Sequence, residues 1–346
     1  MLLQRVFSDE RAVKRWSEVK ALVMDEISMI DGELFENIEY IARVVRYEFT
    51  DEVWGGIQLV VSGDFLQLPP IVDQRQSCGK HFAFEADCWN ASFDLEVELT
   101  NIFRQSDPHL IKLLQGIRRG ESNPDDLKLL VHRCSKAKPD PSAVQLYPRN
   151  EDVNRVNANR MKSLEEESIV YTAVDSGKNP WKSQLEQGLA PTHLEVCEGA
   201  RVMLIKNIDI KLKLVNGATG TIIGFSKPEK KSVLNLSPKD LLPIVKFDSG
   251  KTVVIEPETW DVTEGDLVVA TRKQIPLVLA WALSIHKCQG MTLDRLHTDL
   301  SRAFGCGMVY VALSRVRSLE GLHLSGFRSS KIIAHPKVLQ YYQRFG

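Results

Sequence analysis

Two adjacent carboxylates, Asp25 and Glu26, directly follow the apolar run Leu22–Met24. Such a run is typical of a buried strand, and in open parallel sheets ligands bind at the carboxyl ends of the strands. There, one carboxylate can hold Mg²⁺ while the other polarises an attacking water, which is Walker B chemistry in nucleotide hydrolysis. Acidic residues are also favoured in the first turn of a helix, so the pair alone leaves a helix-capping role open.

A second strand-like run, Ile57–Val61, leads into the polar loop Ser62–Pro70, which contains Gln67. The carboxamide of Gln67 could contact both a terminal phosphate and the attacking water, and could therefore sense the state of a nucleotide. An ordinary strand-to-turn connection with a surface glutamine is the alternative. The preceding Asp-Glu pair favours the nucleotide interpretation.

Two arginines have the chemistry to contact a phosphate. Arg104 lies in Leu99–Gln105, where it could span a cleft, although most arginines are simply solvated. Arg315 lies in Tyr310–Arg317, whose apolar residues predict a helix face from which Arg315 projects. An arginine so placed can stabilise charge on a transferred phosphoryl group. A structural arginine that pairs with a nearby carboxylate is the alternative.

The segment Ser284–Thr292 places His286, Lys287 and Thr292 around Gly290. Glycine permits close approach of the backbone, and basic and polar groups beside it suit contact with a phosphodiester backbone. For His286 by itself, a packed or helix-capping histidine is the better interpretation.

These residues need a scaffold that holds strand ends together. Helical spacing over Leu34–Val45, between two apolar runs, predicts strands that alternate with a helix and therefore a parallel sheet covered on both faces. A further predicted strand, Ala143–Tyr147, and a predicted helix, Glu151–Leu164, continue this alternation of strands and helices. Short strands with glycine turns between Cys197 and Val269 instead predict a small inserted barrel.

Composition narrows the class of protein. The 346 residues are 43% hydrophobic and 26% charged, which excludes wholesale disorder and collagen-like repeats. No apolar stretch is long enough to cross a bilayer, so no membrane association is expected. With 44 basic and 45 acidic residues the net charge is −1, so binding of nucleic acid must depend on a local groove.

The cysteines indicate a reducing compartment. No C-x-x-C pair or zinc-type spacing occurs among Cys78, Cys88, Cys134, Cys197, Cys288 and Cys306. Reduced thiols are typical of cytosolic, nuclear or matrix proteins.

Taken in order, the five blocks closely resemble the Pif-type (petite integration frequency) DNA helicases, which are RecD-like members of superfamily 1. The matching motifs are D-E-I-S, G-D-F-L-Q-L-P-P, F-R-Q, S-I-H-K-C-Q-G-M-T and Y-V-A-L-S-R. The resemblance spans roughly Ala21–Phe327, and five motifs in order are far more specific than any one alone.

The resemblance implies an α/β fold with two RecA-like P-loop NTPase domains, the first incomplete, and a small SH3-like β-barrel inserted in the second. The implied boundaries are 1–108 for the first domain, 109–196 with 270–335 for the second, 197–269 for the barrel and 336–346 for a C-terminal tail.

The resemblance also implies an ATP-dependent 5′-to-3′ helicase that uses Mg²⁺. Such an enzyme binds single-stranded and forked DNA and unwinds DNA in replication, recombination, repair and telomere maintenance. A monomer in the nucleus, the mitochondrion or both is expected. By motif, Asp25 is the metal ligand and Glu26 the base, while Gln67 is the sensor. Arg104 and Arg315 contact phosphate. His286, Lys287 and Thr292 contact DNA.

One departure from the family is the phosphate-binding loop G-x-x-x-x-G-K-[ST], which these residues do not contain. The Gly250-Lys251-Thr252 sequence lies between two strands and reads as a hairpin turn, without a following helix N-terminus to bind phosphate. We therefore expect a fragment, an incomplete gene model or a decayed copy, which is inactive alone and has an uncovered edge on the strand that ends at Asp25.

Two other functions remain open. A catalytically silent remnant could still bind single-stranded DNA. A carboxylate-metal nuclease would need more clustered carboxylates, and Asp25, Glu26 and Asp64 are better explained at an ATP site.

Overall fold

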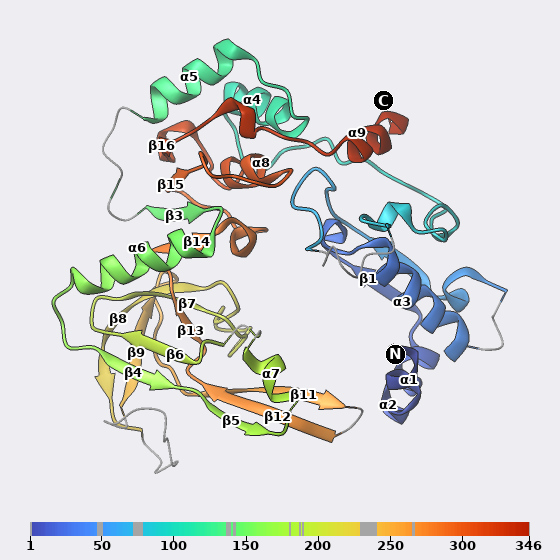
Figure 1. The fold of residues 1–346 in the computed structure, drawn as a ribbon, viewed down its shortest axis with the longest axis horizontal. Helices are drawn as coiled ribbons and strands as arrows, with labels where there is room; N and C mark the ends of the chain where they lie inside the picture. Colours follow the sequence, from blue (N-terminus) through green and yellow to red (C-terminus); the bar gives the residue numbers. More distant parts are fainter. Residues whose placement is uncertain are drawn as a thin grey trace. The chain divides into compact units, whose positions relative to one another are not determined.

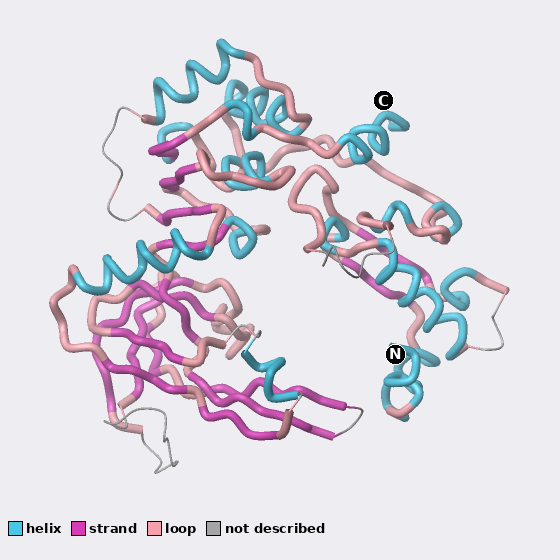
Figure 2. The backbone as a smooth tube through the Cα atoms, in the orientation of Figure 1, coloured by secondary structure: helices cyan, strands magenta, loops and turns pink. Residues whose placement is uncertain are grey.

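The computed structural model describes residues 2–46, 51–71, 79–135, 140, 143–179, 181–186, 188, 190–228, 241–264 and 267–345. The chain divides into two compact units (Figure 1). Unit 1 consists of Met1–Pro148 and Ile285–Gly346, and unit 2 is the continuous segment Arg149–Ser284. Helices and strands alternate in unit 1, whereas unit 2 consists mainly of strands (Figure 2).

The first part of unit 1 has two helices at its start and then a strand-helix-strand arrangement. Its elements are α1 (Leu2–Phe7), α2 (Glu10–Glu18), β1 (Ala21–Met24), α3 (Gly32–Val45) and β2 (Gln58–Val61). Asp9 caps α2 and Asp31 caps α3, because each carboxylate accepts hydrogen bonds from first-turn amides. β1 and β2 pair in parallel with Met24 opposite Val61, so both strands end at the same edge.

An aromatic core supports this strand edge. Phe35 of α3 contacts Trp54 and Trp89, and Phe65, which follows β2, contacts Trp89 as well. The helix α9 (Pro336–Tyr342) from the end of the chain contributes the fully buried Val338 to the same core. The core therefore joins residues from both segments of unit 1.

The second part of unit 1 is a parallel sheet with helices. Its elements are α4 (Pro108–Arg118), α5 (Pro124–Cys134), β3 (Val144–Tyr147), β15 (Leu296–Asp299), α8 (Met308–Leu313) and β16 (Leu322–Gly326). β15 pairs in parallel with both β3 and β16. α4 packs against α8, and α5 packs against β16. α4 and α5 both begin with a proline behind an Asp or Asn cap, which is a favoured helix start.

Unit 2 is built around an antiparallel sheet in the order β10-β9-β8-β7-β13. Its strands are β7 (Arg201–Leu204), β8 (Thr219–Ser226), β9 (Leu242–Phe247), β10 (Thr252–Val254) and β13 (Leu277–Leu279). The pair β4 (Ile169–Thr172) and β6 (His193–Val196) contributes to the same buried core, against which Met161 of α6 (Asn150–Lys162) packs. Strand β14 (Ala282–Ser284) ends the unit.

A second antiparallel sheet in unit 2 has the order β11-β12-β5. Its strands are β5 (Val174–Gly177), β11 (Glu258–Glu264) and β12 (Leu267–Gln274), with the short helix α7 (Trp181–Glu186) packed against it. Arg272 of β12 is almost fully buried and forms a two-pronged ion pair with Asp175 of β5, with both N···O distances 2.7 Å. A buried arginine needs such a partner, so this pair fixes the position of β5 on β12.

The units differ from the domain boundaries expected from the sequence. Residues 149–196 lie with the segment 197–269, because β4 pairs with β6 and β5 pairs with β12. Residues 109–148 lie with the first hundred residues in unit 1. The expected tail, residues 336–346, contains α9, which is packed in the core of unit 1 because Val338 and Tyr341 are apolar or aromatic. Within the described residues, every helix is too short or too polar to span a bilayer.

Candidate functional site

Asp25 and Ser62 lie side by side where β1 and β2 end. Ser62 Oγ donates a hydrogen bond of 2.5 Å to Asp25 Oδ1, and the backbone N–H of Glu26 donates to the same oxygen at 2.9 Å. These hydrogen bonds, the one from Ser62 first, lower the pKa of Asp25. The carboxylate is therefore ionised at neutral pH and exposed, as a Mg²⁺ ligand must be.

The donor set suits Mg²⁺ rather than a metal held in a protein cage. Among the described residues, no three His, Cys, Asp or Glu side chains gather as a metal site. Mg²⁺ is commonly held by one or two carboxylates together with substrate phosphates and water. Asp25 can supply that single carboxylate.

Glu26 has an unusual backbone conformation and a distant partner. Its φ of 52° and ψ of 48° place it in the left-handed region, which costs free energy in any residue except glycine. Its Oε2 accepts a hydrogen bond of 2.8 Å from Nε2 of Gln289. Gln289 belongs to the Ser284–Thr292 segment, so the structure brings two of the predicted motifs into direct contact.

Gln67 lies at the end of a tight turn after β2. Its backbone N–H donates to the carbonyl of Asp64 at 3.0 Å, which closes the turn. Gly307, with a φ of 73°, packs so closely that a Cβ there would lie 2.2 Å from the Gln67 carbonyl oxygen. The side-chain Oε1 of Gln67 is buried and accepts no hydrogen bond from any described residue, and the same holds for Oε1 of Gln289. Both amides can therefore accept a hydrogen bond from a water or a ligand.

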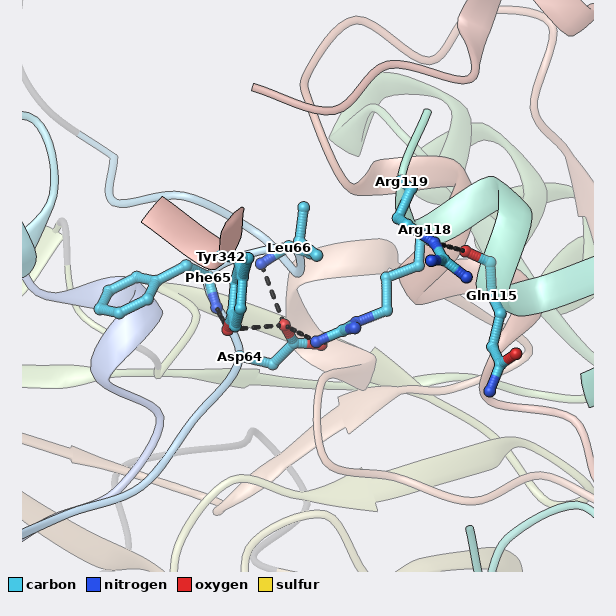
Figure 3. Close-up of polar contacts among 7 residues, drawn as sticks. All are labelled: Asp64, Phe65, Leu66, Gln115, Arg118, Arg119 and Tyr342. Atoms are coloured by element: carbon cyan, nitrogen blue, oxygen red, sulfur yellow. Dashed lines mark hydrogen bonds and ion pairs between the residues drawn. The ribbon is translucent and has the colours of Figure 1, made fainter. Parts of the chain in front are cut away.

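Asp64 links this turn to two helices (Figure 3). Arg118 of α4 binds it with both prongs, with Nη2 2.9 Å from Oδ1 and Nε 3.1 Å from Oδ2. Burial disfavours the charge of Arg118, but the hydrogen bonds and negative charge of Asp64 outweigh that effect and raise the guanidinium pKa. Tyr342 of α9 donates to Asp64 Oδ1 at 3.3 Å. Asp64 is thus occupied by protein partners.

Arg104 and Arg315 meet at Ser314. Arg104 donates from Nη1 to the Ser314 carbonyl oxygen at 3.4 Å and from Nε to Thr292 Oγ1 at 3.0 Å. Arg315 donates from Nη2 to Ser314 Oγ at 2.8 Å and from Nε to the carbonyl of Val311 at 2.9 Å. The structure therefore brings together two arginines that are far apart in the sequence.

The expectation that Arg315 projects from a helix face is wrong. α8 ends at Leu313, and the Arg315 side chain folds back against the last turn, leaving only 2% of the residue exposed. The physical reason is that the unpaired carbonyls of the last helical turn attract its guanidinium. Burial, and then the neighbouring charge of Arg104, lower the pKa of Arg315. Within the described part of the chain, neither arginine forms an ion pair with a carboxylate.

The predicted DNA contacts differ in exposure. His286 and Lys287 lie in the 3-10 turn Ile285–Cys288, where Lys287 is exposed and His286 is half-buried. Burial lowers the pKa of His286, so its ring is neutral at pH 7. Thr292 is exposed but already accepts the hydrogen bond from Arg104.

A cavity of about 580 Å³ lies beside these groups in unit 1. Its walls include Ser62, Asp64, Arg104, Arg118 and Tyr310. Pockets for small-molecule ligands typically measure about 300–1,000 Å³. The cavity is therefore large enough for a nucleotide-sized ligand. Of the residues predicted to contact ATP, Arg104 lies in its walls, whereas Asp25, Glu26, Gln67 and Arg315 are not among its lining residues.

Several residues of the site were not predicted. Gln289 lies inside a recognised motif, so its position in that motif was the available signal. Arg118 and Tyr342 lie outside the motifs, and no local pattern marks them as partners of Asp64.

Comparisons with known proteins consistently find similarity to one family of DNA helicases. The model of the family described as PIF1-like helicase matches residues 3–123, and that described as DNA helicase Pif1, 2B domain, matches residues 182–225. An ATP-dependent DNA helicase PIF1 from Xenopus laevis is 41% identical over 333 residues, covering 96% of this chain and 50% of that protein. The chain thus spans about half the length of the curated relatives it matches.

Solved structures of Pif1 helicases are also similar to this chain. The crystal structure of Pif1 helicase from Candida albicans has a TM-score of 0.89 and 35% identity, and the match covers 100% of this chain and 81% of that one. The Pif1 helicase from Bacteroides in complex with ADP-AlF3 and ssDNA has a TM-score of 0.75 and 29% identity, with coverages of 97% and 77%.

Proposed function

Because this chain belongs to the PIF1-like helicase family, we propose that it carries the motor parts of an ATP-dependent helicase that moves 5′ to 3′ along single-stranded DNA. The family assignment and the mixed α/β, RecA-like helicase fold support this function. Unwinding of forked DNA during replication, recombination, repair and telomere maintenance, by a monomer, is part of the same proposal.

The single observation that carries the proposal is the pair of guanidinium groups at Ser314. Arg315 is buried, Arg104 lowers its pKa, and no described carboxylate pairs with either group. Two neighbouring positive charges that form no direct ion pair with a described carboxylate favour an anion, and arginine is well suited to phosphate. The negative charge of Glu26 also acts on Arg315, which supports a phosphate site near the proposed base.

The remaining groups fit the hydrolysis of a terminal phosphate. Asp25 would hold Mg²⁺, which when bound neutralises charge on the phosphates. Glu26 can accept a proton from the attacking water, and the amide oxygens of Gln67 and Gln289 can accept hydrogen bonds from water in the site. Arg104 and Arg315 stabilise the negative charge of the transition state.

Single-stranded DNA is the proposed track, with Lys287, His286 and Thr292 as contacts. Lys287 is exposed and can meet a phosphate, whereas the neutral ring of His286 can donate or accept a hydrogen bond. Thr292 shares its hydroxyl with Arg104, so this residue joins the DNA segment to the phosphate-binding arginines.

We propose that the strand-rich part of unit 2 is an SH3-like barrel. The five-stranded antiparallel sheet, the β4-β6 pair and their common core support this assignment. The match of the 2B-domain family model to residues 182–225 overlaps β6, β7 and β8.

A reducing compartment, the nucleus or the mitochondrion, is the proposed location. Five cysteines are described, and all of them are free; Cys78 lies outside the described residues. Burial raises the pKa of Cys88 and Cys134 to about 11 and that of Cys288 to about 12, so these thiols are protonated and unreactive. Buried free thiols suit a compartment in which disulfides do not form.

ATP hydrolysis stimulated by single-stranded DNA tests the proposed function. The 346 residues alone should hydrolyse ATP negligibly, because they contain no phosphate-binding loop. A version joined at its N-terminus to a Walker A segment of the family should hydrolyse ATP. Glu26→Gln in that version should lower kcat by about 100-fold or more while leaving ATP and DNA binding within about twofold.

Two outcomes would contradict these expectations for ATP hydrolysis. Turnover by the 346 residues alone, lost on Glu26→Gln, would show that the loop is dispensable. A folded, DNA-binding extended version without any turnover would instead support the silent single-strand-binding remnant.

A further inference from the structure

Three consecutive backbone amides in the turn that carries Gln67, those of residues 65–67, donate hydrogen bonds, and one of the three acceptors belongs to the distant helix α9 (Figure 3). The Phe65 N–H donates to Tyr342 Oη at 3.2 Å, and the Leu66 N–H donates to Asp64 Oδ1 at 3.1 Å. The Gln67 N–H donates to the Asp64 carbonyl at 3.0 Å. The conformation of the turn therefore depends on Tyr342 and on the orientation of the Asp64 carboxylate.

The Asp64 carboxylate is itself fixed by the two helices. Arg118 holds both of its oxygens, which sets the plane of the carboxylate. The Tyr342 hydroxyl donates to Oδ1, and the Arg118 guanidinium lies over the Tyr342 ring at 5.3 Å from its centroid. Burial, and then the charge of Asp64, raise the pKa of Tyr342, so its hydroxyl stays protonated and can both donate and accept.

Helix α9 is firmly attached, so Tyr342 has a defined position. Val338 is fully buried in the core, and Lys337 forms an ion pair with Glu85. The neighbouring Tyr341 stacks on Phe84 with ring centroids 4.5 Å apart and contacts Phe65 at 5.3 Å.

We propose that Tyr342 and Arg118 are positioning residues for Gln67: they hold the Asp64–Gln67 turn and, through it, orient the glutamine amide. In this role both residues act through Asp64 and the turn. The proposal rests on the proposed role of Gln67 as nucleotide sensor, and it makes α9 a structural part of that sensor.

Amide hydrogen exchange measured by NMR on the 346-residue chain, without nucleotide, tests this. Tyr342→Phe removes one hydroxyl but keeps the ring and its contact with Arg118. Tyr341→Phe is the matched control, because it makes the same change one residue earlier in the same helix. In Tyr342→Phe, protection of the Phe65 and Gln67 amides should fall about tenfold or more, since Phe65 loses its acceptor. In Tyr341→Phe, the protection of the same two amides should change less than threefold.

The two-pronged contact of Arg118 gives a second comparison. Arg118→Lys keeps the charge but loses the fork, so it should restore only part of the protection that Arg118→Gln removes. Equal protection of Phe65 and Gln67 in Tyr342→Phe and Tyr341→Phe would overturn the proposal. So would a loss spread evenly over the core.

Hydrolysis in the Walker A-extended version separates the proposal from the function it rests on. Tyr342→Phe should lower kcat several-fold with little change in KM, and should add nothing in a Gln67→Ala background. Reduced protection without any effect on hydrolysis would refute the sensor role of Gln67 while keeping its positioning. An additive effect in the Gln67→Ala background would refute action through Gln67.

Discussion

Gln289 donates a hydrogen bond of 2.8 Å from its Nε2 to Oε2 of Glu26, although 263 residues separate the two in the sequence. Gln289 follows the proposed DNA contacts His286 and Lys287, whereas Glu26 is the proposed base. Movement of the proposed DNA-contacting segment would therefore act directly on the carboxylate that is proposed to activate water. If the proposed function holds, this contact is a physical route by which DNA binding would change ATP hydrolysis.

The Glu26–Gln289 hydrogen bond should contribute measurably to stability. Gln289→Ala should lower the free energy of unfolding by about 1–2 kcal/mol, because a hydrogen bond to a charged group is lost. Urea denaturation measures this. Gln115, an exposed glutamine of α4, offers the control: Gln115→Ala should change the value by less than about 0.5 kcal/mol. Equal effects of the two substitutions would argue against the hydrogen bond.

Gly307 and Gly305 give a matched test of the packing around Gln67. Gly307→Ala places a Cβ 2.2 Å from the Gln67 carbonyl oxygen at a φ of 73°, whereas in Gly305→Ala the nearest atoms are at 3.6 Å, an ordinary contact. We expect Gly307→Ala to destabilise the chain by about 2 kcal/mol or more and Gly305→Ala by less than about 1 kcal/mol. Thermal melting of both variants measures this difference. Similar melting temperatures would contradict the close packing of Gly307 against Gln67.

Arg315→Lys should nearly abolish turnover. In the Walker A-extended version we expect kcat to fall by about 10³-fold or more, because lysine lacks the planar guanidinium that can meet several acceptors at once. Binding of single-stranded DNA without nucleotide should barely change. If Arg315 is only structural, Arg315→Lys would keep most of the activity and Arg315→Ala would chiefly lower the melting temperature. Measuring kcat and melting temperature for both variants separates the two roles.

The Asp175–Arg272 pair should make the stability of unit 2 depend on acid pH. Hydrogen bonds from Arg272 lower the pKa of Asp175 in the folded chain. Its contribution to stability is therefore complete above the unfolded-state pKa of about 3.9 and is lost as the pH falls through the folded value. Asp175→Asn should lower Tm at pH 7 by about 4–8 °C and flatten its dependence on acid pH. Asp261→Asn, at an exposed position of β11, should do neither.

Lys287 should contribute one phosphate contact to DNA binding. Lys287→Ala should weaken binding of single-stranded DNA and reduce the slope of log K against log salt by about 0.7. His286→Gln should leave the slope unchanged at pH 7, because burial keeps that ring neutral. Lys112→Ala, at an exposed position of α4, is the control for nonspecific charge. A slope that is equal in Lys287→Ala and the control would exclude the contact.

Local patterns predicted much of unit 1. Helical spacing predicted a helix over Leu34–Val45, and α3 spans Gly32–Val45. The apolar run ending at Val61 predicted a strand, and β2 spans Gln58–Val61. These elements follow from neighbouring residues, which is why one sequence suffices.

The remainder depends on partners that are distant in the sequence. Arg118 and Tyr342 acquire their roles only when α4 and α9 meet Asp64, and no periodicity marks such a meeting. The strands β11 and β12 were missed because polar residues such as Thr271 and Lys273 dominate them, so they lack a hydrophobic alternation. The position of Arg315 was misjudged because the helix ends two residues before it.

The packing of Val338 and Tyr342 beside Phe65 also constrains the order in which the chain folds. Unit 2 is one continuous segment, so its strands can pair through contacts of modest sequence separation. The core of unit 1 must instead bring together residues separated by more than half the chain, and such distant contacts form slowly because a long loop has to close first. Unit 2 is therefore expected to reach its native structure before α9 packs against the turn that holds Gln67. The proposed ability to sense nucleotide would then be among the last properties that the folding chain acquires.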